Sequence, residues 1–108
     1  MIIRYSDAFK NQLKRLSRRY RRIRSDVRPF LDRLSAGETP GDRIQVPGHV
    51  LYKARIRNSD AARGKRGGYR IIYYVQTEGA LLLVAIYSKS DQGDIAHEEL
   101  LTIIDQEG

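Results

Sequence analysis

Cysteine is absent from the sequence, which excludes both disulfide bonds and metal sites built from thiolates. Histidine is scarce: His49 and His97 are the two present, and neither belongs to a His-Glu-x-x-His pattern or to a pair of spaced ligands. Zinc chemistry is therefore not expected. We predict that His49 lies in a loop and His97 in an acidic helix, both in surface or packing roles.

Long apolar runs are also missing. The longest, residues 81–87, is far shorter than the ~20 residues that cross a bilayer and indicates a buried strand instead. The N-terminal residues MIIRYSDAF lack the apolar core and the small-residue cleavage site of a signal peptide. We therefore expect a cytoplasmic protein with no membrane partner. A chain of 108 residues, 41% hydrophobic and 31% charged, fits a single folded domain over residues 1–108.

Charge is distributed unevenly along the chain, with twenty Lys and Arg against thirteen Asp and Glu and a net charge of +7. Residues 1–35 carry a net charge of +8 and residues 49–75 a net charge of +6, whereas residues 76–108 carry −6. This asymmetry indicates a polyanionic partner, foremost a nucleic acid, because cationic side chains gain affinity by releasing phosphate counterions. A solvated basic helix face is the alternative that charge alone leaves open.

An apolar stripe crosses the N-terminal third at Phe9, Leu13, Leu16, Tyr20, Ile23, Val27, Phe30 and Leu34. Its alternating spacing of four and three residues is that of one helix face. Ser6 or Asp7 can cap the start, because a short side chain with an oxygen accepts the free N–H groups of the first turn.

Two features predict a break within this stripe. Pro29 lacks an N–H and belongs near a helix start, and Ser25 and Asp26 precede it as candidate caps. We therefore predict two helices, over residues 7–20 and 25–35, packed as a hairpin over a sheet. Residues 37–48, which contain two prolines, are predicted to form a loop.

Residues 50–57 alternate between an apolar face and a face carrying Lys53, Arg55 and Arg57. A period of two is typical of a strand. The other predicted elements are strands over residues 2–5, 69–75 and 81–87 and an amphipathic C-terminal helix over residues 94–106. The fold class is thus α+β in the order β-α-α-β-β-β-α, with the helical hairpin on one face of a four-stranded, mostly antiparallel, twisted sheet.

The catalytic motifs of several enzyme classes are missing. Residues 64–68, GKRGG, precede a strand rather than a helix that begins with Ser or Thr, so the phosphate-binding P-loop pattern fails. Nucleophile-elbow and kinase patterns are absent as well. What remains is a concentration of Lys, Arg and Tyr on neighbouring strands.

Such residues can cleave RNA without a metal. The reaction removes a proton from the 2′-hydroxyl, stabilises a phosphorane and protonates the 5′-oxygen. A lysine crowded by arginines has its ammonium form disfavoured, which makes it a candidate general base. Arginine offers phosphate oxygens a planar fork of donors that are in place before charge develops. A purely binding surface is the other interpretation of these residues.

Three segments resemble toxins of the RelE/ParE superfamily: LYKAR at 51–55, GKRGGYRIIYY at 64–74 and LVAIYSKS at 83–90. The central motif is similar to that of the HigB-type branch, and the resemblance covers essentially the whole chain. It implies a RelE-like microbial RNase fold and a toxin of a type II toxin–antitoxin system. It also implies ribosome-dependent cleavage of mRNA in the A site, with no cofactor and no metal. The expected partners are a cognate antitoxin and the 70S ribosome with its mRNA and rRNA.

The resemblance also implies roles for individual residues. Lys53 would act as general base, Arg55 would stabilise the phosphorane, and Arg70 would hold the scissile phosphate. Lys89 would assist the leaving oxygen. Some relatives carry a C-terminal tyrosine that contacts the substrate, but residues 94–97 here read DIAH. Either Tyr74 or Tyr87 substitutes, or the acid–base assignment differs.

Further residues are expected to bind RNA: Arg18, Arg19, Arg22, Arg57, Arg63, Lys65, Arg66 and Tyr74. Two alternative functions remain at this point. A ParE-like relative shares the fold but inhibits DNA gyrase without cutting RNA, and a non-catalytic nucleic-acid-binding module would bind without producing cleavage products. The dense Lys and Arg cluster favours the ribonuclease.

Overall fold

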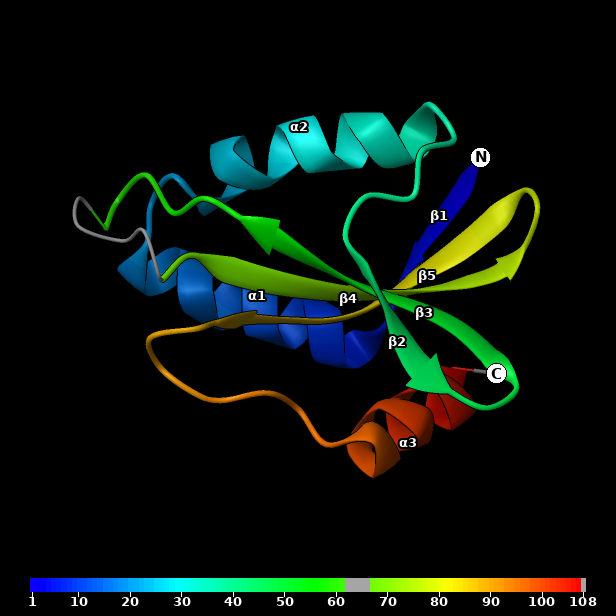
Figure 1. Cartoon of the computed structure of the whole chain (residues 1–108). Coiled ribbons are helices and arrows are strands. Elements are labelled where there is room, and N and C mark those ends of the chain that lie inside the picture. Colours follow the sequence, from blue (N-terminus) through cyan, green and yellow to red (C-terminus); the bar gives the residue numbers. More distant parts are fainter. Residues whose placement is uncertain (62–66, 108) are drawn as a thin grey trace.

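The computed structural model describes residues 1–61 and 67–107, and its element order follows the predicted one with an additional strand (Figure 1). The α+β class is confirmed. The strands are β1 (Ile2–Tyr5), β2 (Asp42–Val46), β3 (His49–Ile56), β4 (Tyr69–Thr77) and β5 (Ala80–Ser88). The helices are α1 (Asp7–Arg19), α2 (Ile23–Ser35) and α3 (His97–Glu107). No helix in the described ranges is long and apolar enough to span a membrane.

The five strands form one sheet in the order β1-β5-β4-β3-β2. Strand β1 pairs with β5 in parallel, and the other neighbours pair antiparallel. Strands β4 and β5 are therefore central, and β5 is buried over almost its whole length. This explains why its sequence is a continuous apolar run rather than an alternating one.

Strand β2 corrects the predicted loop over residues 37–48 and the predicted count of four strands. Pro47 and Gly48 form a two-residue hairpin turn, with Gly48 at φ +80°, so that Val46 pairs with His49. His49 accordingly lies in strand β3 and not in a loop. The strand is short and mostly exposed, so it carries little of the hydrophobic alternation by which strands are recognised in sequence.

Helix α1 begins at a Ser6 cap, one of the two predicted, and Asp7 is its first residue. The Ser6 hydroxyl accepts a hydrogen bond from the Phe9 N–H at 2.9 Å and donates one to the Val84 carbonyl at 2.7 Å. A single buried side chain therefore satisfies the helix end and joins it to the central strand β5.

Helix α2 begins at Ile23, two residues before the predicted start, and Pro29 lies inside it. Ser25 and Asp26 are therefore not caps. The Asp26 carboxylate instead accepts hydrogen bonds from the backbone N–H and hydroxyl of Ser59, which follows strand β3. Ser25 and Pro29 both lie on the exposed side of the helix, where solvent can replace the donor that proline lacks.

The sheet separates two hydrophobic clusters. Helices α1 and α2 cover one face, where Phe9, Ile23 and Phe30 pack on residues of β3, β4 and β5. Helix α3 covers part of the opposite face through Leu100 and Ile104. Figure 1 shows α2 and α3 on opposite sides of the sheet. Helix α3 leaves part of this face uncovered. The predicted catalytic residues lie on that uncovered part.

Buried tyrosines make the fold sensitive to alkali. Burial raises the pKa of both Tyr69 and Tyr73 well above the ordinary value and raises that of Tyr87 to about 12. A tyrosine whose pKa is higher in the folded than in the unfolded state stabilises the folded state fully below the unfolded pKa of about 10. This part of the free energy of unfolding is lost as the pH rises from there through the folded pKa. We expect the Tm to fall steeply above about pH 10. A Tyr73→Phe variant should lose less of its Tm between neutral and alkaline pH, and an equal loss would contradict the assignment.

Candidate active site

Strand pairing brings three of the predicted catalytic residues into one row across the sheet. Arg55 of β3 lies opposite Arg70 of β4, and Arg70 lies opposite Tyr87 of β5. Lys53 occupies the adjacent row, opposite Ile72. Residues directly opposite each other in a sheet share a face, and two arginines in that relation repel each other. The row lies where β3 ends and β4 begins, and it combines an exposed Arg55 with a buried Arg70.

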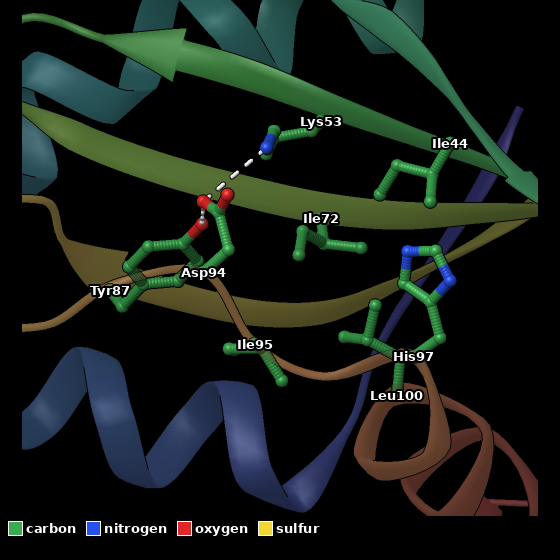
Figure 2. A pocket seen from close by; sticks show the side chains of 8 residues that line it. All are labelled: Ile44, Lys53, Ile72, Tyr87, Asp94, Ile95, His97 and Leu100. Carbon is green, nitrogen blue, oxygen red and sulfur yellow. Dashed lines mark hydrogen bonds and ion pairs between the residues drawn. The ribbon is translucent and has the colours of Figure 1, made fainter.

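Beside this row, Lys53 and Tyr87 line a small hollow of about 80 Å³ between the sheet and the start of helix α3 (Figure 2). The lining residues are Ile44, Lys53, Ile72, Tyr87, Asp94, Ile95, His97 and Leu100. Lys53, Tyr87 and Asp94 lie together at one end of the hollow, its polar end. The other end is lined by His97 and apolar side chains (Figure 2).

Asp94 joins the polar end of the hollow together. Its Oδ1 atom accepts hydrogen bonds from the Tyr87 hydroxyl at 3.0 Å, from Lys53 Nζ at 3.4 Å and from Lys89 Nζ at 3.5 Å. Figure 2 shows its carboxylate between Lys53 and Tyr87. The hydrogen bond from Tyr87 and the positive charge of Lys53 and Lys89 lower the pKa of Asp94. The carboxylate is therefore ionised at neutral pH.

Tyr87 contributes a hydroxyl group rather than an open ring face, because its side chain is 2% exposed. Burial and the neighbouring Asp94 carboxylate raise the pKa of its phenol to about 12. The phenol thus remains protonated across the physiological range and its proton is directed at Asp94. Tyr74, the other tyrosine considered, lies four residues from Arg70 along β4, which is ~13 Å. It packs against His49 with ring centroids 5.3 Å apart.

Arg70 is mostly buried and has backbone partners. Its Nη1 atom donates to the Gly67 carbonyl at 3.0 Å and to the Tyr69 carbonyl at 3.3 Å. These bonds fix the guanidinium at the start of β4, and they are the side-chain hydrogen bonds that Arg70 forms with the described residues. Arg70 thus supports the chain where β4 begins as well as adding charge to the row.

A comparison with protein families matches residues 9–105 to the RelE toxin of the RelE / RelB toxin–antitoxin system. The chain belongs to the RelE toxin family. It is therefore a toxin of a type II toxin–antitoxin system, and family membership implies an antitoxin as its partner. The match covers almost the whole chain and agrees with the observed fold. Its place in the HigB-type branch stays a prediction.

Three of the arginines predicted to bind RNA lie at the end of helix α1 of this RelE-family toxin or just beyond it. Arg18, Arg19 and Arg22 are all exposed. Arg19 forms an ion pair with Asp91 at 2.9 Å, which ties the helix end to the segment that carries Asp94. Arg57 is exposed just past the end of β3. The predicted RNA-binding residues Arg63, Lys65 and Arg66 lie outside the described residues.

Sequence reasoning missed two residues of the site, Asp94 and His97. Both come from the stretch that follows strand β5, which was predicted to be wholly helical from residue 94. Helix α3 begins only at His97, so residues 94–96 cross the sheet face before the helix starts. The sequence shows that this segment is rich in negative charge. It does not show that the segment contacts the cationic strands.

Proposed function

We propose that this RelE-family toxin is a metal-independent endoribonuclease that cleaves mRNA in the ribosomal A site and thereby arrests translation. The observation that carries the proposal is the convergence of Lys53, Arg55, Arg70 and Lys89 beside a hollow on one sheet face. A phosphodiester gains negative charge as it becomes a phosphorane, and fixed cationic donors stabilise that charge. Family membership supports the proposal because toxins of this family are generally endoribonucleases.

The residues can be assigned to the steps of a transphosphorylation. Arg55 and Arg70 would bind the nonbridging oxygens, since guanidinium groups stay charged and donate in pairs. Lys53, once its ammonium group has lost a proton to solvent, would accept the proton of the 2′-hydroxyl as a neutral amine, and the oxygen of that hydroxyl attacks the phosphorus. The bond to the 5′-oxygen then breaks, and Lys89 would supply the proton which that oxygen takes up. The products would be a 2′,3′-cyclic phosphate and a 5′-hydroxyl.

Tyr87 fits the acid–base chemistry less well than the lysines, because its phenol is buried and its proton is held by Asp94. Its hydroxyl would instead help to order the groups at the polar end of the hollow. Tyr74 would offer a partly exposed ring to RNA farther along the same sheet face. The neutralising antitoxin would have to cover this face or the surface that meets the ribosome.

Four exposed arginines would bind ribosomal RNA: Arg18, Arg19, Arg22 and Arg57. Each phosphate contact releases a counterion, and the more counterions are released, the more steeply affinity falls with salt. The affinity for ribosomes would therefore fall steeply as the salt concentration rises. A cytoplasmic location follows from this target.

Primer extension on a defined mRNA tests the proposal. New ends within codons should arise with the wild-type toxin in the presence of ribosomes and be absent when ribosomes are omitted. An intact message with translation still arrested would reject cleavage, and gyrase supercoiling would then be assayed to test the ParE-like alternative. Binding of RNA without either effect would identify a non-catalytic module.

A further inference from the structure

Three hydrogen-bond donors meet at the carboxylate of Asp94. Two ammonium groups and one phenol point at a single carboxylate oxygen, from strands β3 and β5 and from Lys89 just beyond β5. One negative charge faces two positive ones, so the cluster keeps a net positive charge. Such a cluster still attracts an anion while Asp94 is in place.

The contacts are also uneven in quality. The bond from Tyr87 is 3.0 Å long, whereas the two lysine contacts are 3.4 and 3.5 Å, long for charge-assisted hydrogen bonds. One oxygen atom cannot serve three donors well. A phosphate group offers several acceptor oxygens and can satisfy each donor separately.

Asp94 is placed so that its side chain can leave without the main chain moving. Its side chain is 59% exposed. The adjacent Ile95 is buried, and Asp91 is held by Arg19. Rotation about the side-chain bonds of Asp94 would therefore free Lys53, Tyr87 and Lys89 while the segment itself stays in position.

We propose that Lys53, Tyr87 and Lys89 form a phosphate subsite that Asp94 occupies in the free toxin, and that a phosphate of the RNA displaces the Asp94 carboxylate. That the phosphate belongs to RNA rests on the proposed function. The anion site itself rests only on the contacts of Asp94. Asp94 thereby competes with ligand and limits the binding of stray phosphates by the free protein.

Inorganic phosphate binding by the full chain tests this competition directly. Phosphate is titrated into the ¹⁵N-labelled wild type and the Asp94→Asn and Asp91→Asn variants at fixed ionic strength, and amide shifts are followed by NMR. Asparagine keeps an acceptor for the Tyr87 hydroxyl but removes the charge. We expect Asp94→Asn to bind phosphate about five-fold more tightly than wild type, the loss of one exposed ion pair. The shifts should centre on the amides of Lys53, Tyr87 and Lys89.

Asp91→Asn is the matched control, because it removes the same charge from the same segment while its carboxylate pairs with Arg19. It should bind phosphate as the wild type does. Equal or weaker binding by Asp94→Asn would overturn the proposal, as would an equal gain in Asp91→Asn, which would indicate a general charge effect.

A second measurement separates this inference from the proposed function. With programmed ribosomes and limiting toxin, Asp94→Asn should cleave mRNA at a lower toxin concentration than wild type. If neither protein cleaves mRNA, the proposed function fails, whereas the phosphate titration still decides whether Asp94 occupies an anion site.

Discussion

A Lys53→Met variant is expected to cleave mRNA on programmed ribosomes about 10²–10⁴-fold more slowly than the wild type, the usual contribution of a positioned acid–base group. Methionine keeps an unbranched apolar stem next to Ile72 and Asp94 but removes the ammonium group. The Lys53 side chain is 33% exposed, so the fold should tolerate the change. The measurement is single-turnover cleavage, with the Tm recorded in parallel.

Lys10→Met is the control for this variant. Lys10 is a charged residue of helix α1 that contacts Asp7, at the opposite end of the helix from Arg19. Its replacement should leave cleavage within about three-fold of the wild type, the range of exposed charge effects. A Lys53→Met variant that cleaves as fast as Lys10→Met would remove Lys53 from the mechanism.

Arg70 is a less informative position for the same experiment. Its guanidinium holds the Gly67 and Tyr69 carbonyls at the start of β4, so Arg70→Ala removes both a charge and a backbone support. A loss of cleavage in that variant would combine the two effects. Lys53→Met does not combine these effects. In the described residues, the one side-chain hydrogen bond of Lys53 is with Asp94 and none supports the backbone.

The second large effect is expected at Gly68, where β4 approaches β3. Gly68 has φ +80°, and an added Cβ would lie 2.5 Å from the Ile56 carbonyl oxygen. Its own carbonyl accepts the Lys89 N–H at 2.9 Å. Gly68→Ala must therefore shift the backbone of two strands beside the site. We expect the free energy of unfolding to fall by about 2–4 kcal/mol, measured by urea denaturation.

Gly48→Ala provides a matched control for Gly68→Ala. Gly48 also has φ +80°, but an added Cβ would meet nothing within 4 Å. Its replacement isolates the cost of the backbone conformation, which is about 1 kcal/mol. If both variants lose the same free energy of unfolding, the close approach of Gly68 to Ile56 does not contribute to stability. That result would contradict the prediction for Gly68→Ala.

The elements with strong periodicity were predictable from sequence. The alternation over residues 50–57 placed Lys53 and Arg55 on one face, and strand pairing confirms it. The apolar stripe of the N-terminal third gave both helices of the hairpin, because their packed faces need buried residues every three or four positions. The start of α2 was misplaced by two residues, since Pro29 is tolerated on its exposed side, and the end of α1 by one.

What could not be predicted depends on contacts distant in sequence. Strand β2 exists because it pairs with β3, and its own residues have little hydrophobic pattern. Asp94 reaches the site through a segment without periodicity, and its role follows from Lys53, which is 41 residues away. Register between β4 and β5 places Tyr87 beside Arg70, a pairing that no local pattern fixes.

End-group analysis of mRNA incubated with programmed ribosomes and the wild-type toxin tests the central claim most directly. Attack by the 2′-hydroxyl predicts a 5′-hydroxyl on the downstream fragment and a 2′,3′-cyclic phosphate on the upstream one. An RNA with a single 2′-deoxynucleotide at the cleaved position should stay intact. Uncut mRNA on ribosomes that the toxin has stalled would contradict the claim, as would cleavage of the 2′-deoxy substrate at the same rate.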